Sequence, residues 1–342
     1  MPSRRTFLTT GLSALAAPAL AASGAEYRAV LSGAYGAPLD PLAAHRRALS
    51  ATATLQARAG VLLHGQGLRT GSVAERLRRL AKDPRWLYPA DEAGRDRAVA
   101  DMNGRIAALR PRLDRVFAGV AIAPAAVQRM PLADVTAGRG GYREAPQIRD
   151  QGGYKPGAYY LDLHAIRERP IWTLPSAAFH EVTPGHLLQL PLQAAASPPP
   201  DRVKASGAYF EAWGIYAEQL AADLGAYAQD PRGEIGYLQW CLFRLGRIVA
   251  DTGLHALGWS RDQAIAAMTD LQGQSVAFIT IEADVDRIAA TPGKYAAEGL
   301  GALALAAWRP ADRTQWPAFH RAVLADGPWP FGELEQRVRN PA

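Results

Sequence analysis

The sequence has little of several features that would define a protein class at once. Cys241 is the only cysteine in 342 residues, so no disulfide can form within the chain. It lies in an apolar helical pattern, which favours a small buried hydrophobic residue over a nucleophile. After the N-terminal segment no apolar run approaches the roughly 18 residues that a membrane span needs. The chain is therefore expected to have no membrane span.

Basic residues are in excess but are not concentrated. The net charge is +6, yet the arginines are spread over helix faces with no stripe of interleaved basic and aromatic side chains. Nucleic acid is therefore not an expected partner. No long linker or internal repeat divides the chain, which predicts a single domain over residues 23–342. Alanine, leucine and arginine are abundant and β-branched residues few, which favours a mainly α-helical fold and leaves the oligomeric state open.

The first 22 residues are expected to be a twin-arginine signal peptide. Arg4 and Arg5 precede a modestly apolar run, and residues 19–21 form a small-x-small cleavage site. The twin-arginine route exports folded proteins, which suits a protein that acquires a metal in the cytoplasm. The expected destination is the periplasm.

Two histidines and a glutamate lie within one apolar segment, at His180, Glu181 and His186. Imidazole is the commonest zinc ligand, and a glutamate beside the first ligand could take a proton from a water that the metal activates. The usual zincin spacing is four residues, whereas here it is six, which on an ideal helix turns the two imidazoles roughly 120° apart. A shared metal requires that Pro184 and Gly185 break or bulge the helix. Spacing alone leaves a ligand pair and a kinked helix with two hydrogen-bonded histidines as even alternatives.

A second helix carries two acids, at Glu211 and Glu218. Zinc enzymes with a glutamate as third ligand place it on a helix after the histidine helix, which leaves one position open for water. Glu211 is the predicted ligand. Glu218 lies two turns further on the same face, and is either a reserve ligand or an acid that orients a ligand histidine.

A third helix, predicted from about residue 233 to 258, carries Arg244, Arg247, Asp251 and His255 on one face. Because Asp251 could fix the ring of His255, that histidine is a candidate for stabilising an oxyanion, or for replacing His186 as a ligand. A structural ladder of salt bridges is the alternative.

Residues 157–163 are predicted to form a strand. Such a strand beside a zinc helix could pair with the backbone of a peptide substrate, or it could be an ordinary hairpin strand. The sequence favours neither alternative.

Three ordered motifs carry a family resemblance: His-Glu-x-x-Pro-Gly-His-x-x-Gln at 180–189, Glu-x-Trp-x-x-Tyr-x-Glu at 211–218, and residues 251–259. Together they resemble the bacterial domain-of-unknown-function family 885 (DUF885), from about residue 40 to the C-terminus. That family is grouped with metallopeptidases whose third zinc ligand is glutamate. The resemblance implies a zincin-like helical fold, with a small β-sheet beside the metal helix.

The chain departs from the family pattern in two ways. Family members are usually longer ahead of this region, so the chain resembles a shortened member. Near the C-terminus the family tends to show Pro-Gly-Gln-Ala-x-x-Tyr, whereas this chain has Glu298 at the tyrosine position. If that tyrosine binds the reacting carbonyl, this chain must use Tyr295 one turn away or do without it.

These observations predict a zinc-dependent hydrolase, specifically a periplasmic peptidase or amidase that acts on a peptide or small amide. His180, His186 and Glu211 are the predicted Zn²⁺ ligands. Glu181 is the predicted general base, which passes its proton to the leaving amine.

The predicted oxyanion stabiliser is His255, together with Tyr216 or Tyr295. The alternatives are an exported binding or scaffold protein that keeps the metal-site fold without turnover, and an amide or ester hydrolase acting on a small metabolite.

Overall fold

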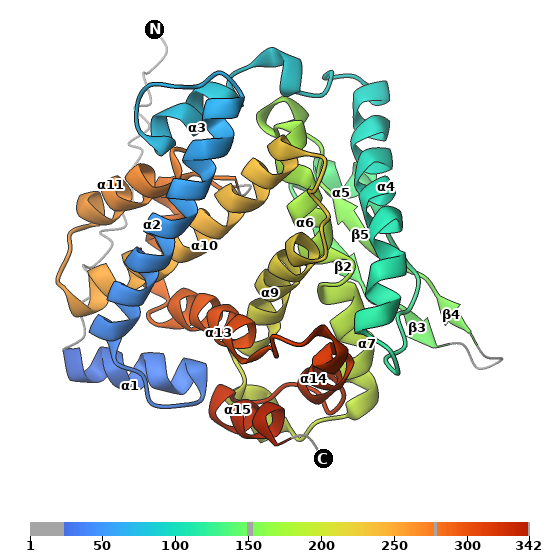
Figure 1. Cartoon of the computed structure of the whole chain (residues 1–342), viewed down its shortest axis with the longest axis vertical. Helices are drawn as coiled ribbons and strands as arrows, with labels where there is room; N and C mark the ends of the chain where they lie inside the picture. Colours follow the sequence, from blue (N-terminus) through green and yellow to red (C-terminus); the bar gives the residue numbers. More distant parts are fainter. Residues whose placement is uncertain (1–23, 149–152, 277–278, 341–342) are drawn as a thin grey trace, which may run out of the picture.

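A computed structural model describes residues 24–148, 153–276 and 279–340. The predicted signal peptide at 1–22 lies outside these residues. The described chain is mainly α-helical with a small three-stranded sheet, as the sequence predicts (Figure 1).

The first helices are α1 (Gly24–Tyr35), α2 (Pro41–Gly65), α3 (Val73–Ala81), α4 (Glu92–Val116) and α5 (Leu132–Thr136). The next are α6 (Leu174–Glu181), α7 (His186–Ala196), α8 (Pro200–Ala205), α9 (Tyr209–Asp223) and α10 (Pro231–Ala256). The last are α11 (Arg261–Gln272), α12 (Ile281–Ala290), α13 (Lys294–Trp308), α14 (Trp316–Leu324) and α15 (Phe331–Arg339). Short 3-10 turns span Pro84–Trp86, Ile166–Glu168, Ile171–Thr173 and Arg313–Gln315.

Several helices begin where side chains can satisfy the first backbone N–H groups. The Asp40 carboxylate accepts from the amide of Ala43 at the start of α2. Ser72 opens α3 and Ser260 opens α11, each in a capping box. Such helix starts are encoded locally, because a cap depends only on neighbours in the sequence.

Helix α10 runs through the middle of the molecule. It packs against α2, α11, α12 and α13, and most of its 26 residues are buried. Figure 1 shows α2 crossing in front of it. The position of Cys241 on this helix agrees with the structural role predicted for it, because burial raises the pKa of its thiol to about 12. Helix α10 thereby carries the polar stripe from Arg244 to His255 into the interior.

The sheet lies beside α4, α6 and α7. Its strands are β1 (Ala125–Arg129), β2 (Tyr142–Glu144) and β5 (Gly157–Leu161), while β3 (Gln147–Ile148) and β4 (Tyr154–Lys155) form a separate hairpin. Strand β5 is parallel to β1 and antiparallel to β2. The predicted strand is confirmed, but it is the central one and both of its edges are paired. It therefore cannot take up a substrate strand, and within the described residues β2 has the free edge near α6.

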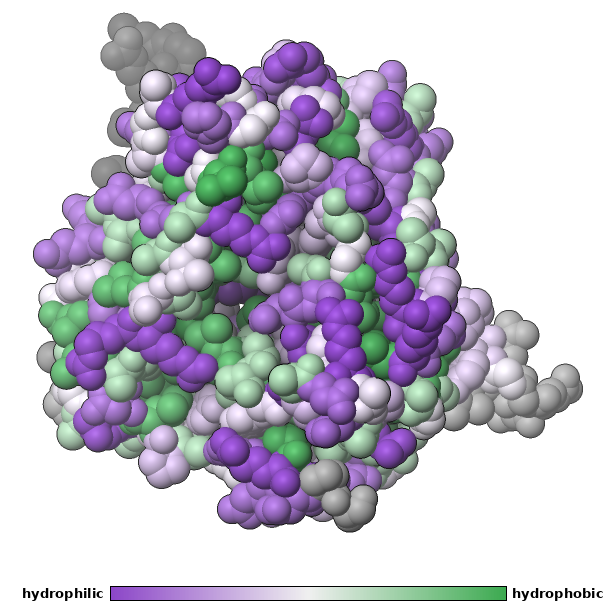
Figure 2. Space-filling view, viewed as in Figure 1, coloured by the Kyte–Doolittle hydropathy of each residue, from purple (hydrophilic) through white to green (hydrophobic). Residues whose placement is uncertain are grey.

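On the face seen in Figure 2, neither hydrophilic nor hydrophobic side chains form one large continuous patch. Hydrophilic and hydrophobic side chains alternate in small groups, and a narrow hollow opens near the middle, where α9, α10 and α13 meet in Figure 1. Among the described helices, none combines the length and the apolar character that crossing a membrane requires.

The buried carboxylate of Asp251 connects three helices. It accepts hydrogen bonds from the Tyr27 hydroxyl of α1 and from the amides of Gly293 and Ala296 at the start of α13, each at 3.0 Å. Its Oδ1 lies 3.9 Å from Nε2 of His255, which is too long for a hydrogen bond. Asp251 therefore caps α13 and does not orient His255 as predicted.

Replacing Asp251 with alanine should lower the free energy of unfolding by about 2 to 4 kcal/mol, because three buried donors lose one charged acceptor. Tyr27→Phe removes only one of the three hydrogen bonds and should cost about 1 kcal/mol. Urea unfolding of both variants measures the difference. Wild-type stability in Asp251→Ala would contradict the capping role.

Candidate metal centre

The helix is interrupted between the two histidines, and the interruption requires a glycine. Helix α6 ends at Glu181 and α7 begins at His186, with a cis peptide bond at Thr183–Pro184 between them. At Gly185 a Cβ atom would lie 1.8 Å from the carbonyl oxygen of His180, so only glycine fits. His180 therefore lies in the last turn of α6 and His186 at the start of α7. Because they are on different helices, the angle between two imidazoles six residues apart on one helix no longer applies.

The three predicted ligands converge. Nε2 of His180 lies 3.4 Å from Oε2 of Glu211, and Nε2 of His186 lies 3.6 Å from Oε1. One ligand atom from each residue lies within 4.8 Å of the other two. Tetrahedral ligands about 2.1 Å from zinc would be roughly 3.4 Å apart, so the spacing is close to what the ion requires.

Two further observations fit a cation at this point. Nε2 of His186 is fully buried and has no hydrogen-bond partner among the described residues, which is costly for a polar atom. On α9, a Cβ atom at Gly214 would lie 2.7 Å from Cε1 of His180 and 2.9 Å from Nε2 of each histidine. The glycine therefore leaves space where the two nitrogens meet. The nitrogen and carboxylate donors are those that zinc prefers.

The far sides of both imidazoles are held by hydrogen bonds. Nδ1 of His180 lies 2.9 Å from Oε1 of Glu218, whose other oxygen accepts from Ser176 at 2.6 Å. Nδ1 of His186 lies 3.2 Å from Oε1, the side-chain amide oxygen, of Gln189. Both contacts favour a proton on Nδ1 and leave Nε2 free to bind a metal. Of the two predicted roles of Glu218, the structure has the orienting one.

The charges of the ligands are strongly coupled. Burial and Arg244 oppose protonation of His180, but Glu211 and Glu218 outweigh them and raise its pKa to about 9. Burial lowers the pKa of His186. Burial alone would raise the pKa of Glu211, yet the two adjacent imidazoles hold it well below its usual range. Without a metal, the proton therefore resides on His180.

The predicted general base has a partner that the sequence did not reveal. Glu181 forms an ion pair with Arg143 of β2. The Arg143 guanidinium lies 5.4 Å from the ring centre of Phe210, which stacks on His186 at 4.0 Å. Arg143 thus borders both the base and a metal ligand. It precedes the histidines by almost forty residues in an irregular segment, so no local pattern could have identified it.

Two residues predicted to stabilise an oxyanion lie elsewhere. Nε2 of His255 lies 3.3 Å from the carbonyl oxygen of Ile288, and its ring stacks on Tyr27. It follows Arg244 by eleven residues on α10, which is about 16 Å along the axis. The predictions that His255 stabilises the oxyanion or replaces His186 are therefore corrected: the polar stripe of α10 continues past the metal centre.

Tyr216 is also directed away from the ligands. Its hydroxyl lies 2.8 Å from Nε2 of His320, in the core. It follows Glu211 by five residues, which turns it roughly 140° around α9. The role predicted for Tyr216 is corrected for this reason.

Residues at the start of α13 remain near the centre. Tyr295 packs on the Arg247 guanidinium, whose Cζ lies 4.5 Å from the ring centre. Glu298, where the family tends to have tyrosine, is only 4% exposed. Burial, followed by the charge of Glu211, raises its pKa to about 7. The oxyanion role of Tyr295 stays a prediction.

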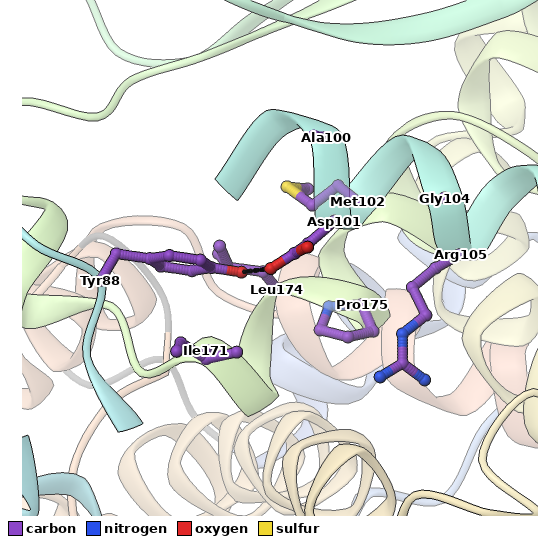
Figure 3. Close-up of a pocket in the computed structure, with 9 residues that line it drawn as sticks. All are labelled: Tyr88, Ala100, Asp101, Met102, Gly104, Arg105, Ile171, Leu174 and Pro175. Carbon is purple, nitrogen blue, oxygen red and sulfur yellow. Dashed lines mark hydrogen bonds between the residues drawn. The ribbon is translucent and has the colours of Figure 1, made fainter. Parts of the chain in front are cut away.

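A separate cavity of about 410 Å³ lies between α4 and the start of α6 (Figure 3). Its polar groups are already paired. The Tyr88 hydroxyl donates to Asp101 at 2.9 Å, and Arg105 forms an ion pair with Asp230. We therefore assign no chemistry to it.

Gly214→Ala should weaken zinc binding at least tenfold, because the new methyl group occupies the space between the two Nε2 atoms. Gly104→Ala is the matched control, since Gly104 lies within α4 with nothing near its Cβ position. The control should gain about 0.5 to 1 kcal/mol in stability and bind zinc normally. Zinc titration and thermal unfolding test both variants, and unchanged affinity in Gly214→Ala would contradict the site.

Zinc affinity should rise about tenfold per pH unit between pH 6 and 8. The pKa of His180 is raised to about 9, so below that pH the ion must displace one proton to bind. Glu218→Gln removes one of the acids that hold this proton on His180. The zinc affinity of the variant should therefore stop rising at a lower pH than that of the wild type. Competition titrations at several pH values provide the test, and a flat profile for the wild type would contradict it.

Comparison with known proteins gives similar structures and a family. No curated protein matches the sequence. A crystal structure from Colwellia psychrerythraea, provisionally described as a lipoprotein, has a TM-score of 0.81 and 31% identity over 92% of this chain. A structure from Shewanella oneidensis, provisionally described as a lipoprotein of unknown function, has a TM-score of 0.72 and 19% identity over 92%.

The chain spans 55% and 59% of the length of those two proteins. The second likeness, at this low identity, supports the fold alone. The model of a family described as a bacterial protein of unknown function (DUF885) matches residues 4–338. The chain therefore belongs to the DUF885 family.

Proposed function

We propose that this DUF885 protein is a zinc-dependent hydrolase of peptide or other amide bonds, with a zincin-like fold. The observation that carries the proposal is the convergence of His180, His186 and Glu211 around a buried, unpartnered imidazole nitrogen. A glutamate adjacent in sequence to the first ligand completes the set that this chemistry needs.

The ligand residues would hold the ion between α6, α7 and α9. A bound zinc ion supplies a coordinated water with a pKa near 7 and polarises the substrate carbonyl. The residues around it are fixed by hydrogen bonds and by packing, so the site would need little reorganisation on binding.

Glu181 and Arg143 would share the proton and charge movements. The Glu181 carboxylate would take a proton from the attacking water and deliver it to the leaving amine. Once protonated, Glu181 no longer neutralises Arg143. The guanidinium charge then becomes available to the oxygen that gains negative charge in the transition state. This assigns to Arg143 the role that the sequence predicted for His255.

The free edge of β2 would position a peptide. Strand β2 carries Arg143, and within the described residues its edge away from β5 has no strand partner. An extended peptide could hydrogen-bond to such an edge. Its scissile bond would then lie near Arg143 and Glu181.

Export to the periplasm is part of the proposal. The Colwellia psychrerythraea structure is provisionally described as a lipoprotein, a class that is exported, and the sequence predicts a signal peptide at 1–22. The twin-arginine route follows from Arg4 and Arg5 alone.

A second candidate is an exported metal-binding protein without turnover. The ion pair between Glu181 and Arg143 favours it, because the carboxylate that would act as the base is already engaged by a guanidinium. Bound zinc without cleavage of a mixed peptide library would select this candidate. Cleavage of small amides or esters, but not peptides, would instead indicate a metabolite hydrolase.

Glu181→Gln should retain zinc and lower kcat by at least a hundredfold, because the amide cannot accept the proton. Metal analysis and hydrolysis of a mixed peptide library by the zinc-loaded protein measure the two effects. Glu282→Gln, an exposed acid on α12, is the matched control and should have wild-type activity. Full turnover in Glu181→Gln would rule out this base, and full turnover after chelation of the zinc would rule out the metal mechanism.

A further inference from the structure

Glu298 is a buried acid beside the metal centre that the mechanism above does not use. It lies one turn into α13 and is 4% exposed. A Cβ atom at the next residue, Gly299, would lie 3.5 Å from the carbonyl oxygen of Arg244, whose Nη2 lies 3.5 Å from Nδ1 of His180. Helices α9 and α13 pack closely, since a Cβ atom at Gly301 would lie 2.8 Å from Cβ of Ala212. Glu298 therefore lies on a helix that packs against the segment of α9 that carries Glu211.

Three cations, Arg247, Arg244 and Lys294, act on Glu298 through their charge without contacting it. Arg247 is bound by Asp284 through two hydrogen bonds of 2.8 and 2.5 Å. Nη2 of Arg244 lies 3.8 Å from Glu218. Lys294 is exposed, with Nζ 5.4 Å from the ring centre of Tyr295. Among the described residues none donates a hydrogen bond to Glu298 or forms an ion pair with it.

A buried carboxylate without a partner is costly, and a protein retains one readily where a ligand supplies the partner. A metal held by Glu211 would add positive charge near Glu298 but offers no N–H group, so the Glu298 carboxylate would still lack a hydrogen-bond donor. The complementary group is a cation small enough to approach a site enclosed by three helices.

We propose that Glu298 binds an ammonium group of the substrate and makes the site select peptides that carry one near the scissile bond. This inference rests on the proposed function. The ammonium can be the α-amino group of the peptide or a lysine side chain, since both offer the same N–H donors. A charge-assisted hydrogen bond in a desolvated site supplies the selectivity.

The test measures binding, so it does not require turnover. Zinc-loaded protein with Glu181→Gln is titrated calorimetrically with trialanine, with N-acetyl-trialanine, and with N-acetyl-Lys-Ala-Ala. The titrations are repeated with Glu298→Gln added, and with Glu333→Gln added as an exposed control on α15. Thermal unfolding verifies that each variant is folded.

Trialanine should bind about tenfold to a hundredfold more tightly than its acetylated form, and Glu298→Gln should remove that preference. The Glu333→Gln protein should keep it. Tight binding of the acetylated lysine peptide, lost with Glu298→Gln, would identify the side chain as the source of the ammonium.

Equal affinities for the three peptides, no binding of any of them, or a preference that survives Glu298→Gln would overturn the inference. If Glu298→Gln does not fold, the comparison of free and acetylated peptides in the Glu298-containing protein decides. A wild type that cleaves peptides without this preference refutes the inference alone. Binding through Glu298 in a protein that never cleaves refutes only the hydrolase.

Discussion

The close approach of Gly185 to the carbonyl group of His180 is the contact on which the candidate metal centre depends. It lets the chain leave α6 and enter α7 within four residues, so that two imidazoles six positions apart face one point. The Trp213 indole donates to the carbonyl oxygen of Pro184 at 3.0 Å and ties the same junction to α9. Because Glu211 lies two residues before Trp213, one junction positions all three ligands.

The electrostatics of the centre follow from burying several charges together. Glu211, Glu218 and Glu298 face Arg244, Arg247 and His180 across α6, α9, α10 and α13. Burying such groups as ions is costly unless each is paired, and among the described residues Glu298 is the acid of this group without a partner. A proton on His180 can balance Glu211 in the empty site, and a divalent cation can replace that proton. The pairing of Glu218 with His180 persists in both states, so the ligand orientation need not change.

The sequence predicted the parts of the protein that depend on near neighbours. The helix break at Pro184 and Gly185 and the position of Glu218, two turns after Glu211, are encoded within a few residues. The mainly helical class follows from composition. The fold beyond this class needed the structure, since nothing local indicates that β5 is a central strand.

Where prediction failed, the missing information was three-dimensional. Helix periodicity correctly placed His255 on the face of Arg244, but it could not show that this face extends past the metal centre. Arg143 comes from an irregular segment and reaches Glu181 only through the sheet. In the sequence, Glu298 is only a departure from the family pattern. Its position near the candidate metal centre follows from the packing of α13 on α9. Periodicity gives the direction of a side chain, whereas its surroundings come from tertiary packing.

The Asp251 carboxylate connects α1, the first described helix, to the buried start of α13. Tyr27 of α1 and the opening amides of α13 share this single acceptor, and Glu298 follows the capped turn directly. A displacement of α1 would thus shift the helix that presents the unpaired acid, without touching any ligand of the ion. An event at the N-terminal edge of the fold, such as docking of another protein, therefore has a mechanical route to the helix that carries Glu298.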